Sequence, residues 1–254
     1  MFDNTKMKVV GNVNVYFNSN EMDTFEMINS TVHLATELIK DKWGLSIPDN
    51  SRIYVMNNWL KFLFQSAPLY YWPIIGLNLP FVFPMMKKSW GSVGGWAKRY
   101  GKRHVIGIKD KQLINLEGSE LGKKIFIPET TIEDKMKHII THELTHVCLS
   151  NYKKPEWFNE GMAMLAVDKI FQKQTVRKDT LDLLAAYNID SIKKSILSNY
   201  IVGYWFVKYL DEKEPETLKR ILSHQNMYED VWIKELSISI IEYKDKVVKH
   251  FESY

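Results

Sequence analysis

Residues 138–161 read HIITHELTHVCLSNYKKPEWFNEG and contain the pentapeptide His142-Glu143-Leu144-Thr145-His146. On an α-helix, positions i and i+4 lie one above the other, so the imidazoles of His142 and His146 can reach a single metal ion. Glu143 lies about 100° around the helix from His142, which puts it beside such an ion rather than on it. A general base that accepts a proton from water belongs in that position. The spacing therefore predicts a metal site.

A third ligand lies a short distance downstream. Glu160 follows His142 by 18 residues, within the run WFNEGMA at residues 157–163. The connection at residues 151–155 is short enough to join two antiparallel helices, so Glu160 can return beside the histidines. The structural alternative is an ordinary helix whose two histidines only face solvent.

HELTH followed by WFNEGMA resembles the gluzincin metallopeptidases, and most closely the peptidase MA-like domains of that group. The resemblance implies that His142, His146 and Glu160 bind one Zn²⁺ ion and that Glu143 is the general base for a metal-activated water. It thus implies zinc-dependent hydrolysis of peptide bonds in a peptide or protein substrate. The alternative is a catalytically silent domain of the same fold that binds zinc or peptides.

The chain departs from the family pattern, beginning with an interval between His146 and Glu160 that is shorter than in thermolysin or aminopeptidase N but suits the peptidase MA-like group. Met164 stands four residues after Glu160, where thermolysin-like enzymes have an aspartate that orients a histidine. Loss of such a partner typically costs about 10- to 100-fold in metal affinity or activity. The chain also lacks the Gly-Ala-Met-Glu-Asn segment that anchors a substrate amino terminus in relatives of aminopeptidase N. The choice between endopeptidase and exopeptidase stays open.

Residues 198–206 (SNYIVGYWF) resemble the helix that supplies the oxyanion donor in this family. We expect Tyr200 to be this donor, because the family pattern has a tyrosine ahead of a small residue and an aromatic pair. Tyr204 stays open as the donor, and so does a core role for either tyrosine. The family binds an extended peptide along an edge strand, for which residues 104–109 and 124–128 are both eligible.

Two further side chains close to the pentapeptide have simpler interpretations. His138 lies one turn before His142 and is expected to be a solvated residue at the start of the helix. Cys148 lies off the face of the two histidines and is expected to be a small buried hydrophobic residue. As the single cysteine of the chain, it forms no internal disulfide.

Composition restricts the class of protein. Hydrophobic residues make up 45% of the 254 residues and charged residues 25%, which is typical of a globular protein. The net charge of +4 comes without a basic stripe or a nucleic-acid-binding motif, so we expect no nucleic-acid partner. The polar start of the chain has no apolar run typical of a secretory signal, so we expect a cytoplasmic protein.

Residues 62–86 contain no charged side chain but four prolines. Those prolines would interrupt the backbone hydrogen bonds of a membrane-spanning helix, so we expect no transmembrane helix. We favour a buried extended or loop segment, and leave open a wall of a substrate groove or contact with a membrane surface.

The order of elements predicts an α+β fold. We expect strands at residues 8–17, 51–56, 104–109 and 124–128, a helix at 21–40, a helical turn at 59–64 and a glycine-rich loop at 91–95. Thr130 and Glu133 fit a capping box at the start of the pentapeptide helix. Helices then follow at residues 155–173, 180–187, 198–210 and 215–223, with a final helical stretch after residue 228.

With the resemblance, this order implies a two-lobed zincin-like fold. Residues 1–150 would form an N-terminal α/β lobe with a small mixed sheet and the helix of the pentapeptide. Residues 151–254 would form a mostly helical C-terminal lobe that carries Glu160.

Overall fold

The computed structural model describes residues 5–91, 93–117, 119–186, 196–224 and 240–253. The chain divides into two compact units. The first comprises Met1–Leu38, Ser46–Ser119 and Pro128–Cys148, and the second Ile39–Leu45, Glu120–Ile127 and Leu149–Tyr254. The protein is of the α+β class, as predicted, with a mixed sheet in the first unit.

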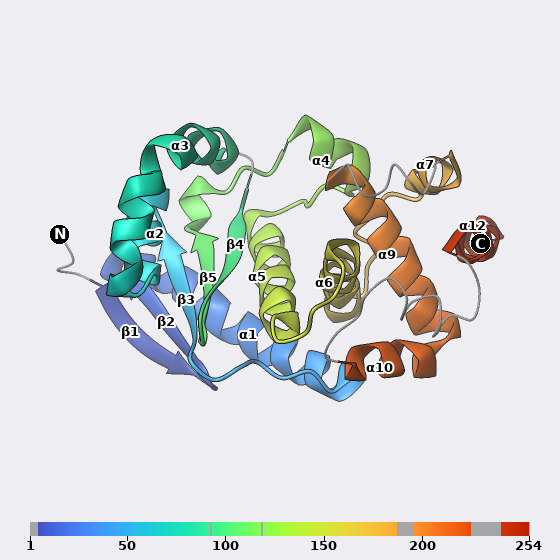
Figure 1. The fold of residues 1–254 in the computed structure, drawn as a ribbon, viewed down its shortest axis with the longest axis horizontal. Helices are drawn as coiled ribbons and strands as arrows, with labels where there is room; N and C mark the ends of the chain where they lie inside the picture. The colour runs from blue at the N-terminus through green and yellow to red at the C-terminus, as the bar shows by residue number, and fades with distance from the viewer. Residues whose placement is uncertain (1–4, 92, 118, 187–195, 225–239, 254) are drawn as a thin grey trace. The chain divides into compact units, whose positions relative to one another are not determined.

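The described residues form a sheet of five strands in the order β1-β2-β3-β5-β4 (Figure 1). Strands β2, β3 and β5 run parallel to one another, whereas β1 and β4 pair antiparallel at the two ends of the sheet. Nearly every residue of β5 is buried, which is typical of a strand covered on both faces. The bounds are β1 (Thr5–Val10), β2 (Val13–Asn18), β3 (Ser51–Met56), β4 (Gly95–Tyr100) and β5 (Arg103–Lys109).

The prediction of one strand at residues 8–17 is wrong, because the chain reverses there. β1 and β2 form a hairpin in which Val10 pairs with Val13 across a two-residue turn. Gly11 occupies the first turn position with φ of +55°, a conformation that glycine adopts at little cost. The dipeptide Gly11-Asn12 is itself a hairpin signal.

The loop predicted at residues 91–95 is confirmed at residues 91, 93 and 94, whereas the strand predicted at residues 124–128 is wrong. The glycine-rich stretch leads directly into β4, which forms a hairpin with β5 through Gly101 at φ of +60°. Residues 124–128 form no named strand, because helix α4 (Glu120–Ile125) extends into them and Phe126 makes an isolated bridge with Val176.

Helix α1 (Met22–Trp43) packs its apolar face into the core of the first unit. Ile28, Val32 and Ala35 recur at helical spacing and are at most 2% exposed, which confirms the predicted helix. The strand predicted at residues 51–56 is also confirmed, since β3 has those bounds.

Residues 62–86 form helices instead of a buried loop. α2 (Trp59–Ser66) is followed by a short 3-10 turn (Leu69–Tyr71) and by α3 (Trp72–Trp90), which continues through Pro80 and Pro84. Much of α3 is exposed, with Leu77 and Phe81 at 77% and 82% of their full accessibility. No helix among the described residues has the length and apolar character needed to cross a membrane.

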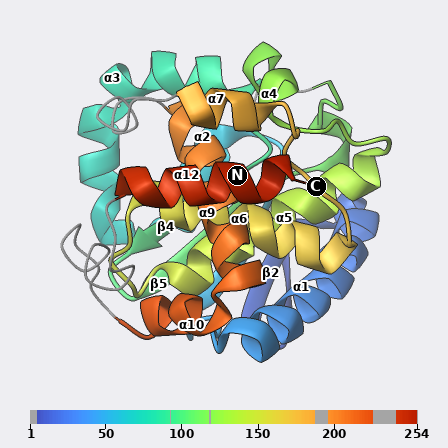
Figure 2. The same cartoon turned by 90° about the vertical axis from the view of Figure 1, so that its right-hand side faces the viewer.

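The second unit is helical. In the part of this unit that the structure describes, the helices in chain order are α4, α6 (Glu156–Phe171), α7 (Thr180–Ala186), α9 (Ile196–Lys213), α10 (Pro215–Ser223) and α12 (Ile240–Glu252). α6 packs along α9, and α12 crosses α9 and contacts α7 (Figure 2). The helices predicted at 155–173, 198–210 and 215–223 are confirmed, whereas Tyr187 and residues 228–239 lie outside the described residues.

Lys154 ties the start of α6 to the end of α10. Its Nζ donates hydrogen bonds to the carbonyl oxygens of Ile221 and His224, the orphan acceptors at a helix C-terminus. Burial lowers the pKa of Lys154 to about 8, so the ammonium still predominates at pH 7.

Helices α6 and α9 approach each other closely at two glycines. A Cβ placed on Gly203 would lie 1.9 Å from the carbonyl oxygen of Trp157, and one on Gly161 would lie 2.2 Å from that of Gly203. Both clashes are with backbone, which no side-chain movement relieves. Only glycine therefore fits at either position while the two helices keep this separation.

We predict that Gly203→Ala lowers the free energy of unfolding by about 3 kcal/mol, because the added methyl group must push α6 and α9 apart. Urea unfolding followed by circular dichroism measures this change. Gly76→Ala is the matched control, since a Cβ there meets nothing within 4 Å and alanine favours an exposed helix by roughly 0.5–1 kcal/mol. Equal stability of Gly203→Ala and the native protein would contradict the assigned contact.

Candidate metal centre

Helix α5 (Ile132–Leu149) carries the pentapeptide, as predicted, but its cap differs by one residue from the prediction. The hydroxyl oxygen of Thr131 accepts a hydrogen bond from the backbone N–H of Asp134 at 3.0 Å, and its O–H donates to the carboxylate of Asp134 at 2.8 Å. Glu133, which the predicted box required, pairs instead with Lys137 one turn along the helix. Thr131 is thus the N-cap.

His142 and His146 lie one turn apart on α5 with their Nε2 atoms 3.0 Å from each other. The ring planes are 83° apart, and both side chains are partly accessible to solvent. In one tautomer, an N–H of one ring donates to the other nitrogen. Two imidazoles on a tetrahedral zinc ion, with Zn–N bonds of about 2.05 Å, have their nitrogens about 3.3 Å apart. The observed separation therefore fits two ligands of one ion.

Glu160 on α6 completes a group of three potential ligands. One ligand atom each from His142, His146 and Glu160 lies within 4.8 Å of the others, the one such group found among the described residues. Two imidazoles and one carboxylate form a donor set that zinc prefers in catalytic sites. Both the distances between the ligand atoms and the types of donor therefore fit a zinc ion.

Glu143 is 9% exposed and lies against the beginning of β4. A Cβ on Gly95 would come within 3.0 Å of Cγ of Glu143, and one on Gly94 within 2.2 Å of Cδ1 of Ile139. The two glycines therefore let β4 pass close over α5, and they leave the space that the carboxylate side chain fills.

The strand beside Glu143 is neither of the two predicted for substrate. β5 is paired on both sides, by β3 and β4, so it has no free edge. Among the strands of the described residues, β4 is the last in the sheet and has one edge without a neighbouring strand. The signal that could have found it is Gly101-Lys102 between two short runs, a two-residue hairpin turn with glycine first.

Tyr204 and Tyr200 differ in what surrounds them. The fully buried Tyr204 donates a hydrogen bond of 2.5 Å to Oδ2 of Asp168. Asp168 also accepts from the backbone N–H and the hydroxyl of Thr175, and burial raises the pKa of its carboxyl group. Tyr200 is partly exposed, and its ring contacts Phe126 edge-on at 5.4 Å. The hydroxyl of Tyr204 is therefore engaged in a structural network that the sequence did not reveal.

The expectation of a solvated His138 is wrong. Its side chain is buried, and Nδ1 lies 2.6 Å from a carboxylate oxygen of Glu129, which is as buried as the histidine. Glu129 belongs to the loop before α5, so this contact ties the loop to the helix.

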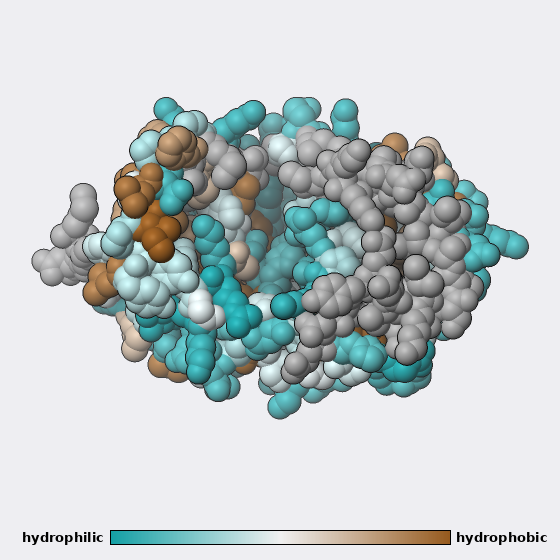
Figure 3. Space-filling model, in the orientation of Figure 1, coloured by the Kyte–Doolittle hydropathy of each residue, from teal (hydrophilic) through white to brown (hydrophobic). Residues whose placement is uncertain are grey.

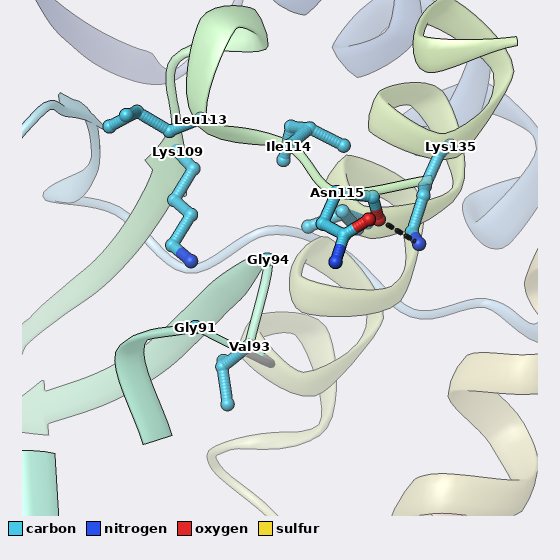
Figure 4. Close-up of a pocket in the computed structure, with 9 residues that line it drawn as sticks. Gly91, Val93, Gly94, Lys109, Leu113, Ile114, Asn115 and Lys135 are labelled. Carbon is cyan, nitrogen blue, oxygen red and sulfur yellow. Dashed lines mark hydrogen bonds between the residues drawn. The ribbon is translucent and has the colours of Figure 1, made fainter. Parts of the chain in front are cut away.

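A small pocket lies at the junction of β4 and α5 within the first unit (Figure 4). Gly94 and Ile139 are among its lining residues, together with two lysines. Lys109 donates to the carbonyl oxygen of Trp90, and Lys135 to those of Asn115 and Leu116. Burial lowers the pKa of both lysines. Their ammonium groups thus already hold the loops that form this pocket.

We predict that Cys148 resists thiol reagents in the native protein. Burial raises its pKa to about 12, so at pH 8 only about one thiol in 10⁴ is ionised, whereas an unperturbed thiol has a pKa of about 8.5. Ellman's reagent at pH 8 should therefore label the protein only after unfolding in guanidinium. Labelling of the native protein at the unfolded rate would contradict the burial of this side chain.

No protein-family model matches the chain, and no curated protein matches its sequence. Two histidines on α5, a glutamate on α6 and a glutamate beside β4 define the candidate site.

Proposed function

We propose that the protein is a zinc-dependent peptidase in which His142, His146 and Glu160 hold one zinc ion and Glu143 is the general base. The observation that carries the proposal is the convergence of the three ligand atoms within 4.8 Å, with the two Nε2 atoms 3.0 Å apart. A two-lobed zincin-like fold is part of the same proposal, supported by the mixed sheet and the helix that bears the pentapeptide.

The identity of the metal follows from the donors and from their neighbour. Two histidines and one carboxylate also suit non-haem iron(II), so the ligands alone do not select zinc. The glutamate that follows the first histidine favours hydrolysis, because it offers a proton acceptor next to the ion. When bound, zinc would acidify a water molecule and polarise the carbonyl group of a substrate.

Glu143 is suited to move a proton. The side chain is mostly removed from solvent, and the close passage of β4 at Gly95 restricts where its carboxylate can lie. A carboxylate held in this way can accept a proton from water and deliver it to the departing amine.

Substrate would bind along the free edge of β4. An extended peptide can pair with this edge through backbone hydrogen bonds, which bring affinity without selecting particular side chains. The start of β4 lies against Glu143, so a peptide on this edge would have a backbone carbonyl close to the base. Tyr200 would then donate a hydrogen bond to the oxyanion that forms during attack.

We predict that the purified protein contains zinc at a stoichiometry near one and cleaves a peptide library. Metal removal with 1,10-phenanthroline should abolish cleavage, and zinc should restore it.

Glu143→Gln should lower kcat by about 10²- to 10⁴-fold while zinc content is retained. Glu160→Gln should weaken zinc affinity by more than about 100-fold, since even outer partners of a ligand contribute 10- to 100-fold. Elemental analysis and mass spectrometry of the products measure these outcomes.

The control is Glu156→Gln, an exposed glutamate in the first turn of α6, which should change neither zinc content nor cleavage. Unchanged turnover of Glu143→Gln would refute its role as base. Zinc and peptide binding without hydrolysis under any condition would support the silent domain instead.

We further predict that Tyr200 contributes to catalysis and Tyr204 to stability. Tyr200→Phe should lower kcat by about 10²-fold, the usual cost of one oxyanion donor, at unchanged melting temperature. Tyr204→Phe should lower the free energy of unfolding by about 1–3 kcal/mol, because it removes a donor from buried Asp168, and should leave kcat of the folded protein close to native. The reverse pattern would assign the donor to Tyr204.

A further inference from the structure

α3 presents an unusually apolar surface to solvent. Ile74, Leu77 and Phe81 recur at spacings of three and four residues, share one face, and are 55%, 77% and 82% exposed. Leu69 and Tyr70, in the 3-10 turn before the helix, are 73% and 70% exposed and extend this surface. Figure 3 shows hydrophobic residues gathered over α2 and α3. Contiguous exposed apolar patches in water-soluble proteins commonly mark an interaction site.

The opposite face of the same helix is fixed to the protein. Trp72 and Ile75 pack against the core cluster that includes Tyr54, Phe62 and Val105. The apolar face described above therefore points outward because the other face is held.

The charged side chains of the segment that contains this surface have one sign. Between Ser51 and Lys109 the chain carries nine basic residues and no acidic one, whereas the remaining residues carry 25 basic and 30 acidic side chains. Lys87 and Lys88 lie exposed in the last turn of α3. At the other end of the helix, the β4–β5 turn with Arg99 and Lys102 approaches the hydroxyl of Tyr70 through Gly101. Cations thus stand at both ends of the apolar face.

We propose that α3 and the turn before it dock on the surface of a bilayer that contains anionic phospholipids. The apolar face formed by Ile74, Leu77 and Phe81 would enter the boundary between headgroups and acyl chains. Lys87, Lys88 and the β4–β5 turn would contact lipid phosphates, and Tyr70 would lie at headgroup depth, where tyrosine is favoured.

The basic charge of this segment favours an anionic membrane over a second copy of the chain as the partner of α3. An isologous dimer through α3 would bring two equally basic segments together, which opposes association. An anionic membrane instead complements both the apolar face and the cations that flank it.

Flotation with phosphatidylcholine vesicles, with and without phosphatidylglycerol, tests the proposal on the intact protein. We expect binding that requires phosphatidylglycerol and that weakens as salt rises from about 0.1 M to about 1 M, where the Debye length falls from ~10 Å to ~3 Å. Leu77→Glu/Phe81→Glu should lower the partition coefficient at least about tenfold. Lys87→Gln/Lys88→Gln should lower it by roughly 10- to 30-fold.

The matched control is Leu34→Glu/Leu183→Glu, which adds the same charge at exposed leucines on α1 and α7 and should bind as the native protein does. Near-ultraviolet circular dichroism checks that each variant is folded. The proposal is overturned if native protein floats with neither vesicle, or if Leu77→Glu/Phe81→Glu binds as tightly as the control. It is also overturned if light scattering finds a dimer that Leu77→Glu/Phe81→Glu dissociates, since α3 would then bind a second copy.

Discussion

The crossing of α6 and α9 at Gly161 and Gly203 is the constraint on which the arrangement of the second unit depends. Glu160 precedes one of these glycines, and Tyr200 lies one turn before the other, so the same contact positions a potential ligand and a potential oxyanion donor. The backbones touch without intervening side chains, which leaves little freedom to slide or rotate. Tyr204, which directly follows Gly203, and Asp168, seven residues after Gly161, link the same pair of helices through a buried hydrogen bond. Packing and polar contacts therefore act together in holding the two candidate functional side chains in one place.

The candidate site could be predicted from the sequence because its parts are local. The relation between His142, Glu143 and His146 follows from helix geometry alone, and α5 forms as expected. The short connection to α6 gave Glu160 a way back to the histidines without knowledge of the rest of the fold. The structural role of Tyr204 could not be foreseen, because Asp168 lies 36 residues away and its partner depends on helix packing.

The sheet and α3 were harder to predict, for two physical reasons. Both hairpins turn on two residues with glycine first, Gly11-Asn12 and Gly101-Lys102, and a long apolar alternation hid the first turn. In α3 the prolines argued against a helix, yet Pro73 falls in the first turn, and contacts of Trp72 and Ile75 with the core offset the hydrogen bonds lost at Pro80 and Pro84. Tertiary packing thus overrode the local preference against a helix. The apolar residues of α3 were expected to be buried, but one face of the helix is exposed.

The two glycines where β4 begins affect both the stability of the strand and the position of the Glu143 side chain. A β-branched residue at Gly95 would favour the extended backbone, but it would occupy the volume that Glu143 now fills. Selection for a more stable strand would thus act against the placement of Glu143, the proposed proton acceptor. The proposed chemistry would therefore keep glycine at this position, so that the strand is less stable than it could be in return for a correctly placed carboxylate.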